Sequence, residues 1–213
     1  MDGAAFVKQL KAENETLLRK LDADPGSGAA DLGPLLKMAL KNEMEAAEIA
    51  AQWVATTPEL DANLALARHA GDEARHYQLL AAEAAALGVD LAGFNPLDPP
   101  SPVLEYLRTL ETTVERVAAA LVTREAMGAR RNAQFVKLLQ AGGHAELAAL
   151  YREIINPDEE RHHQMGCEVL ARLAATPEAQ ERARRAATRL LEIGDRVRSM
   201  MMEKTGATCV PGC

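Results

Sequence analysis

Apolar residues recur every three to four positions along most of the chain, the spacing that places them on one face of an α-helix. Stretches rich in Gly and Pro at 24–33, 88–100 and 142–143 separate the segments that carry this pattern, and these stretches predict loops. The sequence therefore predicts an all-α protein. Its expected helices are 4–22, 34–55, 57–87, 101–141, 144–175 and 177–203.

Residues with known preferences at helix ends support these limits. Thr57, Ser101 and Thr176 each precede a Pro, which is a common combination where a helix begins. Pro157 lies within the segment 144–175, where it removes a backbone hydrogen bond. We expect that helix to bend or to form a local bulge at this proline.

The four central helices are long enough to form one bundle spanning residues 32–175. The loop 88–100 is long enough to connect opposite ends of such a bundle, so we expect a long crossover between the second and third helices. A chain of 213 residues is sufficient for one domain with a full core, 1–213. The remaining expected parts are an accessory helix at 4–22, a fifth helix at 177–203 and an irregular tail at 204–213.

Two sequence motifs occur twice. Ala-Gln-Trp-Val at 51–54 is matched by Ala-Gln-Phe-Val at 133–136. Asp-Glu-Ala-Arg-His-Tyr-Gln at 72–78 is matched by Asp-Glu-Glu-Arg-His-His-Gln at 158–164. The repeats predict that the bundle is a duplicated helical hairpin.

Each copy of the longer motif pairs a Glu with a His three residues later, Glu73 with His76 and Glu159 with His162. On a helix this spacing brings the two side chains onto one face, about 5 to 6 Å apart at Cβ, where both can contact one metal ion. A single pair of this kind is common on solvated helix faces. Two copies in one repeated frame favour a metal site instead.

The other two bundle helices each carry one Glu within an apolar stripe, Glu43 and Glu125. All four Glu residues lie roughly 18 to 24 Å along their helices from the nearest interhelical turn, so they meet at one depth. Buried carboxylates require cations, and one Glu from each of two helices with a Glu-x-x-His from each of the other two is a known ligand set for two iron or manganese ions. We predict two Fe or Mn ions per chain, with the ligands Glu43, Glu73, His76, Glu125, Glu159 and His162.

Two assignments near the motifs have alternatives. In the second copy Glu160 with His163 has the same spacing as Glu159 with His162, and the parallel with the first copy favours the latter. His69 lies one turn before Glu73, and we expect it in the core or around the ligands rather than on the metal.

The repeated Asp-Glu-x-Arg-His motif makes residues 32–175 resemble the ferritin-like di-iron carboxylate proteins. The motif is similar to that of bacterial multicomponent monooxygenases, and the spacing is similar to that of small single-chain members, the tRNA hydroxylases and demethoxyubiquinone hydroxylases. The resemblance implies a ferritin-like four-helix bundle and the six ligands above. It also implies that Asp72 and Asp158 hydrogen-bond an imidazole N–H, with Arg75 and Arg161 close by. The monooxygenases carry a Thr one turn after the third-helix Glu, where this chain has Ala129, which puts their proton relay in doubt.

The resemblance suggests an O2-activating oxygenase or oxidase that acts on a small organic substrate or a modified nucleoside, with electrons from an external donor. Small residues near Glu43 and Glu125, among them Gly128, could line its pocket. The alternatives are a ferroxidase or iron-handling protein, a rubrerythrin-like peroxide scavenger and a metal-binding protein without catalysis. The chain has no Cys-x-x-Cys pairs of the kind found in rubredoxin domains.

Composition limits the partners. The net charge of -7 disfavours nucleic acid, because phosphate binding needs clustered Lys and Arg. Neither a signal peptide nor an apolar run of membrane-spanning length is evident, so we expect a cytoplasmic protein without membrane contact, and a homodimer stays open. Three cysteines do not form a disulfide framework, although Cys209 and Cys213 could be either a free pair or a redox pair.

Overall fold

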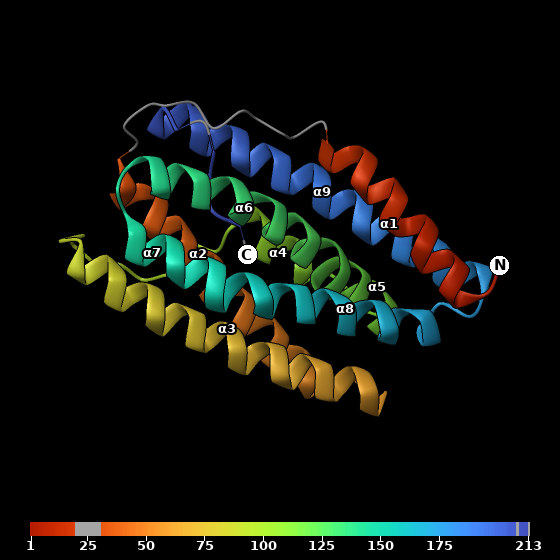
Figure 1. The fold of residues 1–213 in the computed structure, drawn as a ribbon. Helices are drawn as coiled ribbons and strands as arrows, with labels where there is room; N and C mark the ends of the chain where they lie inside the picture. Colours follow the sequence, from red (N-terminus) through yellow and green to blue (C-terminus); the bar gives the residue numbers. More distant parts are fainter. Residues whose placement is uncertain (20–30, 208, 213) are drawn as a thin grey trace.

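The computed structural model describes residues 1–19, 31–207 and 209–212, which are helical throughout their regular parts and contain no strand (Figure 1). None of the helices in these ranges combines the length and apolar character needed to cross a bilayer. The elements are α1 (Gly3–Arg19), α2 (Leu32–Val54), α3 (Leu60–Ala86), α4 (Pro102–Leu107), α5 (Thr113–Arg116), the π-helical η1 (Val117–Arg124), α6 (Glu125–Ala141), α7 (Ala145–Leu150), the π-helical η2 (Tyr151–Ile155), α8 (Asn156–Leu173) and α9 (Pro177–Thr205).

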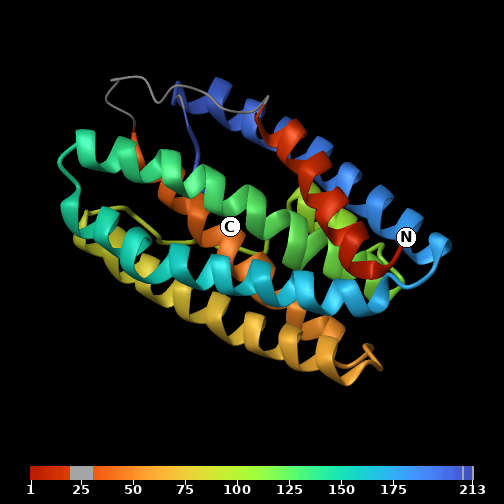
Figure 2. The same ribbon diagram turned by 45° about the vertical axis from the view of Figure 1, so that its right-hand side comes forward.

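The long helices α2, α3, α6 and α8 run side by side in both ribbon views (Figures 1 and 2). Helix α2 packs along α3, and α8 packs against η1, α6 and α3. Helices α1 and α9 contact each other and cover η1 and α8 on the side away from α3. The expected end of the first helix and most of the loop 24–33 lie outside the described residues.

Some helix starts follow the sequence signals and one does not. The Ser101 side chain accepts a hydrogen bond from the Leu104 N–H, and the Thr176 side chain accepts one from the Ala179 N–H, so both predicted caps are confirmed. The predicted cap at Thr57 is wrong. Helix α3 begins three residues later, after Glu59, whose side chain makes no capping hydrogen bond.

The segment 101–141 is not one helix as the apolar pattern predicted. Helix α4 ends at Leu107, and a new helix begins after Thr112, which forms a capping box with Glu115. Thr-x-x-Glu is a strong helix start, and it interrupts an apolar stripe that is otherwise continuous. The buried Arg116 holds the break, because its Nε–H donates to the Leu110 carbonyl at 3.1 Å.

Two π-helical segments precede the acidic residues of the second half. Segment η2 ends before Asn156 and Pro157, which confirms the local bulge expected from this proline. Segment η1 ends directly before Glu125 and was not predicted. Within η1 the Thr123 hydroxyl donates to the Ala118 carbonyl at 2.7 Å. Such segments occur often at functional sites, because the extra residue in the turn rotates the side chains that follow it.

Most of the core of the described residues falls into two large apolar clusters that lie toward opposite ends of the long helices, and a third, small cluster contains Leu18, Met127 and Leu191. One large cluster contains residues such as Trp53, Leu66 and Val122, and the other large cluster contains residues such as Leu40 and Phe135. On each long helix a Glu lies between residues of the two clusters. The flanking pairs are Leu40 and Ile49 around Glu43, Leu66 and Leu80 around Glu73, Val122 and Phe135 around Glu125, and Ile155 and Val169 around Glu159.

The close approach of α8 and η1 gives a test of this packing. A Cβ added at Gly166 would lie 2.5 Å from the Leu121 Cβ and 2.8 Å from its carbonyl oxygen. We expect Gly166→Ala to lower the free energy of unfolding by about 1–3 kcal/mol, because two packed backbones must separate. Urea unfolding followed by circular dichroism measures this effect.

The matched control is Gly71→Ala on α3. A Cβ at Gly71 would meet nothing within 4 Å, so this change should be neutral or stabilise by up to about 1 kcal/mol. Equal effects of the two substitutions would contradict the packing of α8 on η1.

Candidate metal centre

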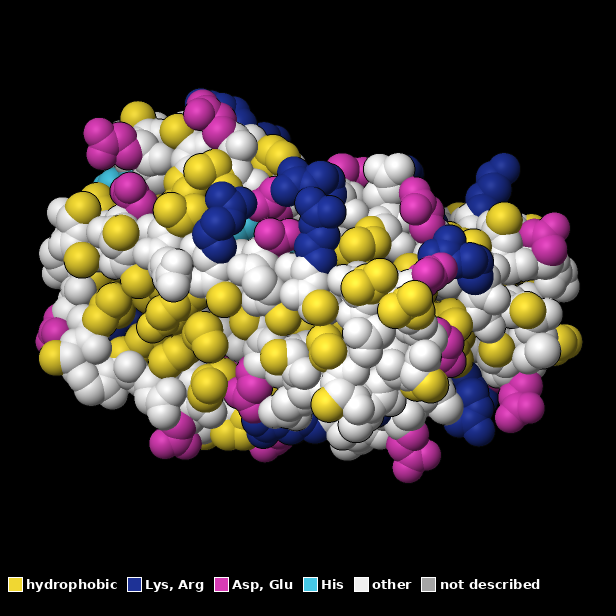
Figure 3. Space-filling model, turned by 90° about the horizontal axis from the view of Figure 1, so that it is seen from below, with side chains coloured by type: hydrophobic (Ala, Val, Ile, Leu, Met, Phe, Trp, Pro, Cys, Tyr) yellow, Lys and Arg dark blue, Asp and Glu magenta, His cyan; other side chains and the backbone are white. Residues whose placement is uncertain are grey.

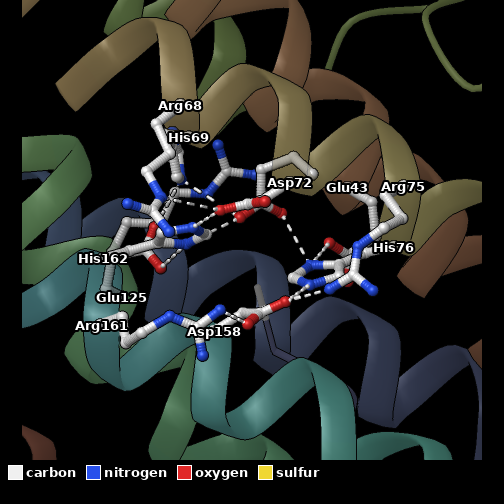
Figure 4. Close-up of polar contacts among 12 residues, drawn as sticks. Glu43, Arg68, His69, Asp72, Arg75, His76, Glu125, Asp158, Arg161 and His162 are labelled. Atoms are coloured by element: carbon white, nitrogen blue, oxygen red, sulfur yellow. Dashed lines mark hydrogen bonds and ion pairs between the residues drawn. The ribbon is translucent and has the colours of Figure 1, made fainter. Parts of the chain in front are cut away.

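The six residues predicted as ligands lie together in the interior. Glu43 comes from α2, Glu73 and His76 from α3, Glu125 from the start of α6, and Glu159 and His162 from α8. Each is at most 1% exposed. Figure 4 shows Glu43 with His76 on one side of the cluster, and Glu125 with His162 and His69 on the other.

Two groups in this cluster have the geometry to hold an ion, and within each group the potential ligand atoms lie within 4.8 Å of one another. Ligand atoms about 2.1 Å from a single ion are at most about 4.2 Å apart, so a small contraction would close either group around a metal. The groups are Glu43, Glu73, His76 and Glu159, and His69, Glu73, Glu125 and His162.

Glu73 is the member that the two groups share. Its Oε1 lies 3.2 Å from His162 Nδ1 and 3.2 Å from His69 Nε2, while its Oε2 lies 3.6 Å from His76 Nδ1. The two oxygens of one carboxylate therefore face different groups. Glu73 could therefore contribute one ligand oxygen to each group.

The imidazoles are oriented by aspartates from the opposite repeat. His76 Nε2 lies 3.0 Å from Asp158 Oδ2, and His162 Nε2 lies 3.0 Å from Asp72 Oδ2. If Nε2–H donates to the aspartate, Nδ1 is left as the basic nitrogen that faces the glutamates. A carboxylate that fixes the tautomer in this way is typical for histidines that bind metals. The hydrogen bonds implied for Asp72 and Asp158 are thus present in the geometry.

The two arginines of the motif both contact one aspartate. Arg75 Nη2 lies 2.5 Å from Asp158 Oδ2, and Arg161 pairs with Asp158 Oδ1. The other aspartate, Asp72, has Arg68 as its neighbour, with Nε 3.8 Å from Oδ2, and Arg68 lies outside the repeated motif. The face of the molecule seen in Figure 3 accordingly carries acidic side chains next to basic ones.

His69 is closer to the cluster than expected from sequence. Its Nε2 lies 3.0 Å from Glu125 Oε1, its side chain is fully buried, and its ring meets the His162 ring edge-on with centroids 4.7 Å apart. It belongs to the second group rather than to the apolar core. The signal was available, because His69 and Glu73 are spaced by one turn and share a helix face with His76.

The rival register in the second motif points away from the cluster. Glu160 is exposed, and His163 Nδ1 lies 2.9 Å from the Val122 carbonyl oxygen. The other nitrogen of this ring lies 3.6 Å from Cys167 Sγ. The geometry therefore favours Glu159 with His162, as the parallel between the repeats predicted.

Without metal, the cluster must balance its charges with protons. Burial raises the pKa of Glu43 and Glu159 well above the usual value of a glutamate. Burial also lowers the pKa of His76 and His162, but the close contacts of their Nδ1 atoms with neighbouring glutamates outweigh it and raise both pKa values to about 10. The metal-free cluster is thus a protonated network in which imidazolium ions replace the missing cations.

The atoms that lack a regular hydrogen bond in the metal-free cluster are the atoms that would bind a metal ion. Both carboxylate oxygens of Glu43 and of Glu159 are buried without a hydrogen bond of regular geometry, and Nδ1 of His76 and Nδ1 of His162 lie 3.2 to 3.6 Å from glutamate oxygens, also without such a bond. Such atoms are rare in folded interiors and point to a missing ion or ligand. A set of carboxylates with imidazoles suits Fe or Mn better than structural Zn, which prefers closed sites of N and S ligands. The residues present therefore fit two such ions.

Comparison with family models, curated proteins and solved structures finds no match for this chain.

The protonated network predicts how the stability of the metal-free protein depends on pH. The pKa of His76 and His162 rises from 6.5 to about 10 on folding, so their protonation stabilises the fold fully below pH 6.5. This contribution is lost as the pH rises toward about 10, and the raised pKa values of Glu43 and Glu159 act in the same direction. The urea midpoint should therefore fall across this range.

Bound Mn(II) should reverse the trend, because metal binds the deprotonated ligands. Urea midpoints measured with and without Mn(II) from pH 6.5 to 9 test both statements. The His163→Ala protein should behave like the wild type. A midpoint that does not change with pH in the metal-free protein would contradict the buried network.

Proposed function

We propose that the chain is a ferritin-like four-helix bundle, formed by α2, α3, α6 and α8, that binds two iron or manganese ions and activates O2. It would oxidise a small organic molecule or a modified nucleoside and take electrons from an external donor. The observation that carries the proposal is the convergence of four glutamates and three histidines on two adjacent groups in the interior.

Two bound Fe(II) ions would supply the electrons and the Lewis acidity that O2 chemistry needs. The chain's own residues perform the remaining tasks. Glu73 spans the two positions, and Asp72 and Asp158 hold the two imidazoles at fixed angles. The apolar clusters on both sides keep bulk water away, which protects reactive species from side reactions.

The burial of the cluster favours ions that stay bound over a centre that takes up and releases iron repeatedly. A ferroxidase must admit and release many ions, whereas every member of this cluster is at most 1% exposed. The iron-handling and peroxide-scavenging alternatives therefore receive less support than an oxygenase or oxidase. The net charge of -7 keeps nucleic acid an improbable partner, although a free modified nucleoside stays within the proposal.

The ligand set predicts the metal content. After anaerobic loading with Fe(II), the wild type should hold two ions per chain. Glu73→Ala should lose both, because Glu73 belongs to both groups, and His69→Ala should retain ions with an altered Co(II) spectrum. Metal analysis and visible absorption of the Co(II) protein measure these outcomes.

The rival register supplies matched controls for metal content. Glu160→Ala and His163→Ala should bind as much metal as the wild type, since both side chains point away from the cluster. A folded wild type that stays free of metal after loading would contradict the proposal.

The reaction with O2 separates the two classes of function. An oxygenase should react slowly or unproductively until its organic substrate fills the pocket, because oxidant made in an empty pocket is wasted. A ferroxidase should consume O2 at once and continue as Fe(II) is added. Stopped-flow absorbance with repeated Fe(II) additions distinguishes them, and sustained turnover of many Fe(II) per chain would overturn the oxygenase assignment.

A further inference from the structure

The segment after α9 turns back into the molecule. Gly206, with φ of 68°, ends the helix in the left-handed conformation that glycine adopts readily. Ala207 and the residues Cys209 to Gly212 that follow are all buried, Cys209 to 2% and Val210 to 1% exposure. In Figures 1 and 2 the chain descends from the end of α9 toward α2 and α6. We call Cys209 to Gly212 the tail.

The end of the tail lies against the face of α6 that carries Glu125. A Cβ at Gly212 would meet the Gly128 oxygen at 2.3 Å and the Gly128 Cα at 2.5 Å, so the two glycine backbones are in direct contact. Gly128 is three residues beyond Glu125, about 4.5 Å along the helix, and shares its face. Gly128 was expected to line a pocket, and the protein's own chain fills that space.

Two asparagine side chains hold the backbone of Gly212. The Gly212 N–H donates to Asn132 Oδ1 at 2.8 Å, and Asn42 Nδ2 donates to the Gly212 carbonyl at 3.4 Å. Asn42 precedes the candidate ligand Glu43, while Asn132 lies two turns beyond Glu125 on the same face. Gly212 thus lies between the two helices that carry the lone glutamates.

The tail forms a hydrogen bond with the side-chain oxygen of Asn132 but not with its side-chain nitrogen. This side chain is fully buried, and its Nδ2 has no hydrogen-bond partner among the described residues. An unpaired buried donor is costly. A ligand that presents an N–H and a C=O side by side, as a lactam or primary amide does, would pair with both Oδ1 and Nδ2. The tail leaves this donor unpaired and is therefore an imperfect occupant.

The attachment of the tail allows it to leave without unfolding a helix. Within the part of the chain that the structure describes, no backbone-to-backbone hydrogen bond involves Ala207 or the tail. A surface groove of about 1070 Å³ reaches Asn42 from outside, between the start of α2, the crossover and the end of α9. A small molecule therefore has an approach to the asparagine that holds Gly212.

We propose that the space between α2 and α6 now filled by the tail is the substrate site, that it binds an amide or lactam group through Asn132 and Asn42, and that the substrate displaces the tail. The binding site stands on contacts that require no metal. Its role as the substrate site rests on the proposed function.

The test uses full-length Gly212→Ala protein, in which the added Cβ should keep the tail out of the site. The probe is the peptide acetyl-Cys-Val-Pro-Gly-amide, added to metal-free protein and followed by isothermal titration calorimetry. A tail tethered by a short linker competes at a millimolar effective concentration, so the peptide should bind in the millimolar range or more tightly to Gly212→Ala and not to the wild type. Absence of saturable binding to folded Gly212→Ala would overturn the proposal.

Matched peptides and variants control for non-specific binding. The peptide that ends in Ala-amide should not bind, because its methyl group would meet Gly128. In the Gly212→Ala protein, the additional substitution Asn132→Ala should weaken binding of the Gly-amide peptide by about tenfold. The lactam 2-pyrrolidone should compete with the peptide, whereas cyclopentanone, which lacks the N–H, should not. Equal competition by the two would overturn the assignment of an amide site.

Release of the tail is read from the Cys209 thiol in a background carrying Cys167→Ser and Cys213→Ser. Gly212→Ala should raise the rate at which Ellman's reagent labels the Cys209 thiol. Asn132→Ala should raise this rate as well, and it replaces Gly212→Ala in the test if that protein folds poorly. The control Gly71→Ala on α3, where an added Cβ meets nothing within 4 Å, should not raise the rate. A thiol that stays protected in both tail variants would contradict a displaceable tail.

Measuring the metal content distinguishes a failure of the proposed function from a failure of the proposed amide site. Peptide binding by a protein that holds no metal after loading would refute the proposed function and leave the amide site standing. In Mn(II)-loaded Gly212→Ala, proton signals of the bound peptide should broaden most at its glycine, the residue expected nearest the ions. Broadening that is strongest at the peptide's cysteine would overturn the placement beside the metal centre.

Discussion

The structure depends on burying four glutamates in one polar layer between two apolar clusters. Carboxylates in such a place are tolerated only with protons or cations, since an isolated buried charge would cost more than a typical domain can spare. The side chains around the glutamates compensate their negative charge in successive layers. Histidines supply positive charge inside the layer, aspartates of the opposite repeat fix those histidines, and arginines at the surface neutralise the aspartates.

The same constraint explains why the second hairpin departs from regular helix. Segment η1 ends directly before Glu125, and a π-helical turn changes the direction of the side chains that follow it relative to regular α-helix. Segment η2 does the same before Glu159, and Pro157 stabilises it by leaving no N–H to pair. Segment η1 thus adjoins its glutamate directly, whereas η2 ends about one turn before Glu159.

The sequence was informative where periodicity and repetition carry the information. The helical class and the six converging residues follow from stripes and spacing along single helices. The break before Thr112, the segment η1 and the place of the tail depend on contacts between distant parts of the chain, which spacing does not encode. His69 is intermediate, because its spacing placed it on the correct face while only packing against Glu125 distinguishes a member of the cluster from a core histidine. Cys213 lies outside the described residues, so the choice between a free pair and a redox pair with Cys209 stays as the sequence left it. Burial raises the pKa of the Cys209 thiol to about 11.

The proposed substrate site has a further difficulty, because its space must be filled when no substrate is present. An open space beside Glu125 and Asn132 would either stay empty, with loss of packing, or admit water to the carboxylates. Filling it with the protein's own chain avoids both outcomes. Backbone contact between Gly212 and Gly128 provides a close fit, while the unpaired Nδ2 of Asn132 keeps that fit incomplete. The proposed substrate site would require an occupant of this kind, one that binds well enough to exclude water and less well than the intended ligand.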